Sequence, residues 1–253
     1  MSVLRLYPPP HERLPLRGLY LTHDLHRQGK TCLYTNFISS LDGRIALKEN
    51  GAFRVPRAIA NPRDWRLFQE LAAQAEAMII GTGYLRALAR GAVENILHLE
   101  DDLRTWRRAQ GLSPQPAAIV LSASLDIPPG LPFPLILITG KKAPQERLAT
   151  LQEQGVQVLF AGEGGKVEPQ ALGELVPHLG FRSIYSAAGP GVLRLLLEAG
   201  LLDRLYLTLS HHLLAGDAFK TLLEGPPLDP PIALRLQGLA YDEGPGQWFV
   251  WFS

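Results

Sequence analysis

A strand–helix–strand pattern in the last third of the sequence constrains the fold more than any other feature. It opens with a short apolar run at residues 183–187, which predicts a buried strand. Ala188-Gly189-Pro190-Gly191 interrupts this run, and residues 192–199 then carry apolar side chains at helical spacing. Gly200 has the position and type of a helix C-terminal cap, and residues 205–209 predict a second strand. We therefore expect a βαβ unit with parallel strands.

The turn inside this unit is a candidate ligand site. Parallel sheets covered by helices bind ligands at the carboxyl ends of their strands, and residues 188–191 follow such an end. Small residues let backbone N–H groups at a helix N-terminus approach an anion, as in pyrophosphate binding. The alternative is a glycine turn that only changes the direction of the chain, and this short motif does not exclude it.

A second turn repeats the pattern. Gly81-Thr82-Gly83 follows a predicted buried strand at residues 77–80 and leads into a helix at residues 84–89. Two such turns can face one extended ligand, and a dinucleotide has two anionic and two planar parts to use both. Neither turn has the spaced triple-glycine fingerprint, which argues against an ordinary dinucleotide-binding Rossmann domain.

The rest of the chain continues the alternation of strands and helices. Asn61 is a capping residue before Pro62 and predicts the start of a helix. Gly244-Pro245-Gly246 separates two β-rich runs, at residues 232–241 and 247–252, and predicts an antiparallel hairpin. Other expected elements are the first strand at 32–38, further strands at 117–121, 135–139 and 156–160, helices at 145–153 and 169–177, and a solvated helix with loops between 90 and 116.

These elements predict an α/β fold. We expect a mostly parallel sheet with helices on both faces and a C-terminal antiparallel hairpin. With 253 residues, 46% of them hydrophobic, the chain can bury a sizeable core, and we expect one domain over residues 1–253. Residues 1–30 are rich in proline, arginine and histidine with weak periodicity, so we expect an N-terminal arm.

Composition narrows the classes of partner. The 25 basic and 24 acidic residues nearly cancel, so we expect neither a nucleic-acid partner nor a membrane partner. No apolar run approaches membrane-spanning length and the N-terminal segment lacks a signal-peptide core, which predicts a cytoplasmic protein. The single cysteine, Cys32, excludes a cysteine metal cluster, and the adjacent His211 and His212 would point to opposite faces of a strand. We therefore expect no metal site.

Several motifs, in their order and spacing, resemble a known family. NFISSLDGRIA at residues 36–46 resembles the first strand and Ser-Leu-Asp-Gly turn of the reductase domain of the bifunctional riboflavin biosynthesis deaminase/reductase. Asn61-Pro62-Arg63-Asp64 resembles the next helix start, and residues 80–83 resemble the family's glycine turn. Residues 187–216 resemble its Glu-Gly-Gly-Pro turn and Gly-Leu-x-Asp segment. The family is a group of pyrimidine reductases with a dihydrofolate-reductase-like fold.

The resemblance implies an NADPH-dependent reductase of a ribosylaminopyrimidine phosphate, acting on a small-molecule substrate and forming a homodimer. It implies a substrate site at Asn36, Ser40, Asp42 and Arg44. The residues expected to bind the cofactor are Ser39, Gly81, Thr82, Gly83, Tyr84, Ser122, Ser124, Ala188, Gly189, Pro190, Gly191, Val192 and Leu193. Ser122 and Ser124, with Lys141 and Lys142, are expected donors for the 2′-phosphate that distinguishes NADPH from NADH.

Asp42 is the candidate catalytic residue. It is the only acid in residues 36–44, and a carboxylate at a strand end can deliver a proton to the reduced bond or anchor an amino group. The alternative is that Asp42 holds the Asp42-Gly43 turn, because aspartate often bonds its own backbone there.

The sequence also departs from the family pattern. The family's Arg-Ala before the second strand is Ala72-Ala73 here, and its Glu-Gly-Gly is Ala187-Ala188-Gly189. Loss of an arginine removes a bidentate phosphate contact, so we expect an altered substrate that is smaller or less charged. The alternatives are a non-catalytic nucleotide-binding relative, a dihydrofolate- or pterin-type reductase, and a protein that keeps only the fold.

Overall fold

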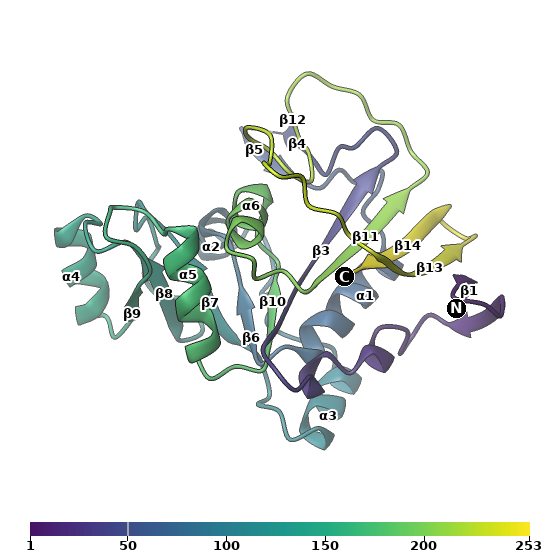
Figure 1. The fold of residues 1–253 in the computed structure, drawn as a ribbon, viewed down its shortest axis with the longest axis horizontal. Helices are drawn as coiled ribbons and strands as arrows, with labels where there is room; N and C mark the ends of the chain where they lie inside the picture. The colour runs from purple at the N-terminus through teal and green to yellow at the C-terminus, as the bar shows by residue number, and fades with distance from the viewer. Residues whose placement is uncertain (50) are drawn as a thin grey trace. The chain divides into compact units, whose positions relative to one another are not determined.

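The computed structural model describes residues 1–49 and 51–253, and Figure 1 shows their helices and strands. The chain divides into two compact units. Unit 1 combines Met1–His23, Tyr34–Leu71 and Leu202–Ser253, and unit 2 combines Asp24–Leu33 and Ala72–Leu201. Each unit draws on segments that are far apart in the sequence. One domain over residues 1–253 stays a prediction.

Unit 2 contains a sheet of parallel strands in the order β10-β6-β7-β8-β9. The central side chains of β10, β6, β7 and β8 are apolar and buried, as in parallel sheets that helices cover, whereas those of the edge strand β9 are half-buried. The strands lie where the sequence predicts them. Their bounds are β6 Ala77–Ile79, β7 Ala117–Leu121, β8 Leu135–Thr139, β9 Gln157–Phe160 and β10 Ser183–Ser186.

Helices follow or connect these strands. The helix α6 (Pro190–Glu198) starts at a proline, whose missing N–H is not needed in a first turn. It ends before Gly200, whose φ of +65° is the left-handed conformation that glycine adopts most readily after a helix. No helix among the described residues is both long and apolar enough to cross a lipid bilayer. The other helical elements of unit 2 are α2 Thr82–Ala89, α3 Asp101–Ala109, α4 Gln145–Glu153, α5 Pro169–Leu175, η2 Leu25–Arg27 and η3 Val176–His178.

Unit 1 contains strands in the order β2-β1-β13-β14-β11-β3. The strands β3 (Cys32–Ser40) and β11 (Arg204–Ser210) pair in parallel, and the other neighbours are antiparallel. The strands β13 (Leu236–Asp242) and β14 (Gln247–Phe252) form the predicted C-terminal hairpin. The α/β class, with its mostly parallel sheet and C-terminal hairpin, is therefore confirmed.

Unit 1 also contains a small antiparallel sheet in the order β12-β4-β5. The helix α1 (Pro62–Gln74) begins after Asn61, whose Oδ1 accepts the backbone N–H groups of Arg63 at 3.1 Å and Asp64 at 3.0 Å. The N-terminal cap read from the sequence is thus confirmed. The remaining bounds are β4 Ala46–Glu49, β5 Ala52–Arg54, β12 Phe219–Lys220 and η1 Leu21–His23.

The N-terminal segment differs from the prediction. Two strands, β1 (Ser2–Tyr7) and β2 (Glu12–Pro15), precede the strand expected to be first. β1 pairs with β13, with Leu4 opposite Tyr241, and β2 pairs with β1. The side chains of Val3, Leu16 and Leu19 are buried, so this segment packs into unit 1. The sequence prediction missed these strands because the strand that pairs with β1 lies near the other end of the chain.

A buried arginine fixes the C-terminal end of α1 within unit 2. Arg107, on α3, is completely buried. Its Nη1 donates to the backbone carbonyls of Ala73 at 2.9 Å and Ala75 at 2.6 Å, and its Nε donates to that of Ser113 at 2.7 Å. Carbonyls at the end of a helix have no partner inside the helix. The segment at residues 90–116, predicted to be a solvated helix with loops, therefore contains a buried arginine that binds the end of α1.

We expect Arg107→Met to lower the free energy of unfolding by at least about 3 kcal/mol, because several buried carbonyls would lose their donor. Urea unfolding followed by circular dichroism measures this change. Arg108→Met is the matched control, since Arg108 is exposed and bonds only a neighbouring hydroxyl, and it should change stability by less than about 0.5 kcal/mol. Equal effects of the two substitutions would contradict the stabilising role of Arg107.

Candidate cofactor-binding edge and substrate turn

Three turns lie side by side at the carboxyl edge of unit 2. β10, β6 and β7 are neighbours in one parallel sheet. The hydrogen bonds continue past the ends of the strands, from Ala187 N–H to the Ile79 carbonyl and from Ile80 N–H to the Ile119 carbonyl, both at 2.9 Å. The turns after the three strands therefore follow one another along one edge. They are residues 187–191, 80–83 and 122–125.

The turn before α6 is open on its outer side. Gly189 precedes the helix with φ −78° and ψ −173°, an extended conformation that any residue can adopt. A Cβ atom added at Gly189 or Gly191 would meet no heavy atom within 4 Å. This geometry leaves room for an anion at the first backbone N–H groups of the helix. Ala188 and Leu193, also expected to bind the cofactor, are buried and position the turn from inside.

The turn before α2 is also open on its outer side. Gly81 is its N-terminal cap, and a Cβ atom there would also meet nothing within 4 Å. Tyr84 uses its hydroxyl within the loop that follows: it donates to the Glu94 carbonyl at 3.2 Å and accepts from Ile96 N–H at 2.9 Å. Burial raises the pKa of Tyr84. The open groups of this turn are therefore its backbone and the side chain of Thr82, which is half-buried.

The two serines after β7 differ in exposure. Ser122 is buried, and its Oγ accepts Leu125 N–H at 3.1 Å, which supports a residue with a φ of +55°. Ser124 is exposed, and its Oγ only weakly accepts Asp126 N–H at 3.4 Å. Ser124 thus offers a hydroxyl to a ligand, whereas Ser122 shapes the turn.

In unit 1, the residues around Asp42 form a tight polar cluster. Ser40 Oγ donates to the Asp42 carboxylate and accepts Arg44 N–H at 3.0 Å. The second carboxylate oxygen of Asp42 accepts the backbone N–H groups of Leu214 at 3.1 Å and Ala215 at 2.8 Å. Asp42 therefore holds its own turn and also anchors the loop that follows β11.

These contacts change the chemistry available to Asp42 and Arg44. The hydrogen bond from Ser40, together with those from Ala215 and Leu214 and the charge of Arg44, lowers the pKa of Asp42 to about 2. A carboxyl group with this pKa has no proton to deliver at neutral pH. Arg44 Nη1 lies 3.2 Å from Asp42 Oδ2, and its guanidinium lies 4.4 Å from the centre of the Phe219 ring. The arginine charge is already partly compensated, which favours the alternative that Asp42 is a turn residue.

The remaining predicted positions divide between the two units. Ser39 is buried in unit 1, where its hydroxyl donates to the Ser40 carbonyl at 2.9 Å, while the other predicted cofactor residues belong to unit 2. Asn36 lies on β3 opposite Tyr206 of β11 and is half-buried. Unit 1 thus brings Ser40, Asp42 and Arg44 together on one turn.

The interpretation of Ala72-Ala73 is wrong. Both side chains are completely buried, and both backbone carbonyls accept bonds from Arg107. A residue here lies at the carboxyl end of α1, inside the protein, and does not face the carboxyl edge of the sheet. Alanine at these positions therefore says nothing about a missing phosphate contact.

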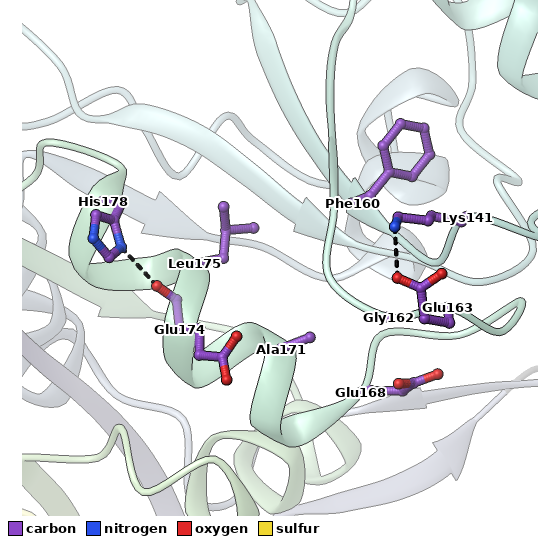
Figure 2. Close-up of a pocket in the computed structure, with 9 residues that line it drawn as sticks. All are labelled: Lys141, Phe160, Gly162, Glu163, Glu168, Ala171, Glu174, Leu175 and His178. Carbon is purple, nitrogen blue, oxygen red and sulfur yellow. Dashed lines mark hydrogen bonds and ion pairs between the residues drawn. The ribbon is translucent and has the colours of Figure 1, made fainter.

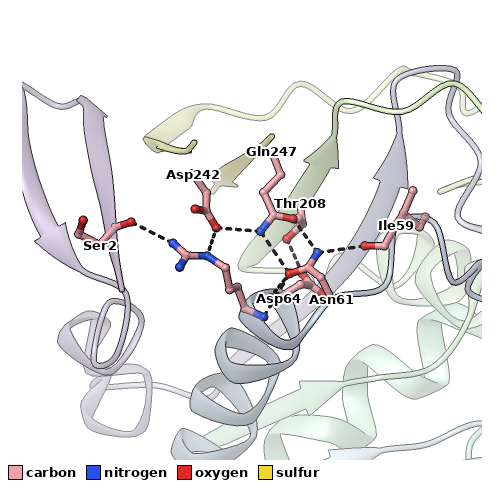
Figure 3. A network of polar contacts seen from close by, with 8 residues as sticks. Ser2, Ile59, Asn61, Asp64, Thr208, Asp242 and Gln247 are labelled. Carbon is pink, nitrogen blue, oxygen red and sulfur yellow. Dashed lines mark hydrogen bonds and ion pairs between the residues drawn. The ribbon is translucent and has the colours of Figure 1, made fainter. Parts of the chain in front are cut away.

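One acidic group with unusual chemistry was not singled out from the sequence. Asp64, at the start of α1, accepts the Thr208 hydroxyl at 2.6 Å, and Figure 3 shows it within a network that includes Asn61, Asp242 and Gln247. Arg63 Nε donates to the carboxylate of Asp242. Burial raises the pKa of Asp64 to about 6, against the lowering effect of the Thr208 bond. An acid in the first helical turn is ordinary, so only the packing against β11 reveals the raised pKa.

The fold and these turns define a class: an α/β protein whose parallel strands end in open, small-residue turns along one edge, as in proteins that hold anionic ligands with backbone N–H groups. Across residues 1–49 and 51–253 there is no group of three or more His, Cys, Asp or Glu side chains placed to hold a metal ion. A family model for the RibD C-terminal domain matches residues 31–243. The chain belongs to this family.

Solved structures share the fold at low identity. A pyrimidine reductase-like protein from Corynebacterium diphtheriae is 21% identical with a TM-score of 0.65, over 95% of this chain and 94% of that one. The riboflavin biosynthesis reductase Rib7 of Saccharomyces cerevisiae is 16% identical with a TM-score of 0.63, over 93% and 97%. RibD of Acinetobacter baumannii is 17% identical with a TM-score of 0.57, over 89% of this chain and 58% of that longer one. No curated protein matches the sequence.

We expect Asp42→Asn to lower the melting temperature at pH 7, because the amide is a weaker acceptor for the backbone N–H groups of Leu214 and Ala215. A lowered pKa stabilises the fold above the ordinary value of 3.8, and this stabilisation is lost as the pH falls through about 2. The difference from wild type should therefore shrink below pH 4 in thermal melts followed by circular dichroism. Asp217→Asn, an exposed acid in the same loop, is the control and should show no such pattern.

Asp64→Asn should stabilise the protein, which is the opposite of the effect expected for Asp42→Asn. Because the folded pKa of Asp64 is raised to about 6, the wild-type protein loses stability as the pH rises from about 4 through 6. The neutral amide escapes this loss while still accepting the Thr208 hydroxyl. We expect a gain of about 1–2 kcal/mol in unfolding free energy at pH 8 and none at pH 4, measured by urea unfolding. An identical effect at both pH values would rule out a raised pKa.

Proposed function

We propose that the protein is a cytoplasmic NADPH-dependent reductase that resembles 5-amino-6-(5-phosphoribosylamino)uracil reductase of riboflavin biosynthesis and acts on an altered substrate. Membership of the RibD C-terminal domain family and the fold shared with pyrimidine reductases support a reductase. The observation that carries the proposal is the row of turns after β10, β6 and β7, of which the first two are open. A dinucleotide laid along this edge meets backbone N–H groups at the first two turns and the exposed Ser124 at the third.

The residues of unit 2 suit this cofactor. The open positions at Gly81, Gly189 and Gly191 are where a Cβ atom would occupy the space of a phosphate. NADPH supplies the hydride, and the protein orients it. Ser124 adds a hydroxyl at the next turn. We assign the pyrophosphate to residues 189–193 and place residues 81–84 beside it.

For the substrate, we propose Asn36, Ser40 and Arg44 as contacts, with Asp42 positioning the turn that carries them. Asp42 partly compensates the charge of Arg44, and the two groups lie 3.2 Å apart. A compensated cation binds a phosphate less strongly than a lone one, which supports a smaller or less charged substrate than the riboflavin intermediate.

A dihydrofolate- or pterin-type reductase and a non-catalytic nucleotide-binding relative are the second candidates. An assay of NADPH oxidation, followed by absorbance, distinguishes these candidates. The compounds to test are the ribosylaminopyrimidine phosphate, its dephosphorylated form, a dihydropterin and a cyclic imine. We expect the dephosphorylated pyrimidine to be turned over at least as well as the phosphate. Binding of NADPH without turnover of any compound would favour the non-catalytic relative. We further propose a homodimer, which sedimentation at micromolar concentration tests.

We expect Gly189→Val to weaken NADPH binding at least about tenfold, because a branched side chain would fill the space assigned to the pyrophosphate. The extended backbone at Gly189 accepts valine, and its Cβ atom meets nothing within 4 Å, so stability should be unchanged. Calorimetric titration and a melting curve measure the two quantities.

Gly29→Val is the matched control, since Gly29 lies outside the row of turns and its Cβ atom would also meet open space. It should leave both affinity and stability unchanged. Unaltered NADPH affinity in Gly189→Val would reject the placement of the pyrophosphate.

A further inference from the structure

Asp42 has no proton to give to a substrate, although reduction of a double bond needs a proton as well as a hydride. With a pKa of about 2, its carboxyl group is ionised at neutral pH. The acid of the proposed reaction is therefore another group near the turn that carries Ser40 and Arg44. Histidine is the side-chain type best suited to this task, because it exchanges its proton close to neutral pH.

His212 lies beside this turn in unit 1. It is the second residue after β11, which ends at Ser210, and Ser210 pairs with Ser40 at the end of β3. Strands paired in this way lie about 4.8 Å apart, and the paired side chains share one face of the sheet. The carbonyl oxygen of His212 accepts the N–H group of Leu41 at 2.9 Å. His212 is thus joined directly to the turn between Ser40 and Asp42.

The backbone on both sides of His212 is also fixed. The N–H group of His211 donates to the carbonyl of Gly246, in the turn of the C-terminal hairpin, at 2.9 Å. Further along the same loop, the N–H group of Ala215 donates to the carboxylate of Asp42 at 2.8 Å. The loop therefore holds His212 in one place beside the proposed substrate contacts.

The ring of His212 is held at one nitrogen and is open at the other. Nδ1 lies 2.8 Å from Oγ of Ser210, whose side chain is buried. His212 itself is exposed, and in the described part of the chain its ring has no other hydrogen-bond partner. The neighbouring His211 differs, because its ring packs against Tyr241 and Trp248 and its Nε2 is buried. Of the two adjacent histidines, His212 is the one that presents Nε2 to a ligand.

We propose that His212, oriented by Ser210, donates the proton that completes the reduction of a carbon–nitrogen double bond in the substrate. The inference rests on the proposed function and adds the acid of the reaction. The carbon atom receives a hydride, with its two electrons, from NADPH, and the π electrons move to the nitrogen atom. That nitrogen takes the proton from Nε2 of the His212 imidazolium. A C–H bond and an N–H bond form, and NADP⁺ and a neutral imidazole remain, which solvent reprotonates.

Asp64 is a second acid on the same face of the sheet. It accepts the hydroxyl of Thr208, two residues before Ser210 on β11 (Figure 3), and burial raises its pKa to about 6. Loss of a proton from either Asp64 or His212 would lower the rate as the pH rises, so the test has to separate them. The other titratable or charged groups on this loop and on the segments bonded to it are Asp42, Arg44, His211, Asp217, Asp242 and Glu243.

The first test is the pH dependence of kcat for NADPH oxidation with the dephosphorylated ribosylaminopyrimidine. In the wild-type protein, kcat should fall as the pH rises between about 5 and 8, the range in which histidines lose their proton. We expect His212→Gln to lower kcat at pH 6 at least about tenfold and to remove this fall. KM, the affinity for NADPH and the melting temperature should change far less, because glutamine is polar and the position is exposed.

Two further variants separate the roles of the neighbouring groups. Ser210→Ala should lower kcat but keep the fall with pH, because the histidine is still present and only its orientation is lost. Asp64→Asn should also keep the fall, since the proton in question is not on Asp64.

His178→Gln is the matched control. His178 is also exposed, and its Nδ1 also has a near partner, the Glu174 carbonyl oxygen at 2.7 Å. It lies in unit 2, on the wall of a cavity beside α5 that Figure 2 shows, and not at the end of a strand. This substitution should leave kcat and its pH dependence unchanged.

A second measurement needs no turnover. In NMR spectra of protein labelled with ¹⁵N-histidine, the same pyrimidine added without NADPH should shift the Nε2 signal of His212. The signal is assigned by its absence in His212→Gln. The Nε2 signal of His178 should stay in place.

The outcomes separate this inference from the proposed function. Wild-type turnover in His212→Gln, or an unmoved Nε2 signal, would overturn the inference alone. Loss of the pH-dependent fall in Asp64→Asn would overturn it as well and would make Asp64 the acid. Failure of the wild-type protein to bind NADPH or to reduce any of the tested compounds would overturn the proposed function, and the inference with it.

Discussion

The parallel hydrogen-bond ladder of unit 2 is the constraint on which the candidate cofactor site depends. Each strand donates to its neighbour in register, and the bonds extend past the strand ends at Ala187 and Ile80. Since all five strands run in one direction, every turn after a strand lies on the same edge. Small residues in the turns after β10 and β6 leave open space before the helices that follow, which is the arrangement that binds anions through backbone N–H groups in other proteins.

Three charged side chains that could be taken for ligand-binding groups instead bind other groups of the protein. Asp42 binds backbone N–H groups of a distant loop, Arg107 closes a helix end, and Lys141 is paired with Glu163. The first two are partly or fully buried, so removing one partner leaves a polar group without compensation. The third is exposed and weak, which makes it suitable for exchange with a ligand. Exposure therefore separates charges that hold the fold from those that a ligand can recruit.

Sequence alone determined most of the local structure. The helix cap at Asn61, the proline start at Pro190 and the glycine stop at Gly200 depend on residues within one or two turns of each other, and each is found as predicted. Short apolar runs bounded by turn residues likewise marked the strands of unit 2. The order and spacing of the motifs identified the family, because they record the order of the elements along the chain.

Only the tertiary structure decided the pairing of β1 with β13, the burial of Ala72 and the chemistry of Asp42 and Asp64. Each depends on a partner far away in sequence. An aspartate beside glycine has the same local sequence whether its carboxylate faces solvent or two backbone N–H groups. The pKa of Asp42 falls because its carboxylate gains hydrogen bonds, from Ser40 nearby and from Leu214 and Ala215 far along the chain, whereas the pKa of Asp64 rises because packing removes its water.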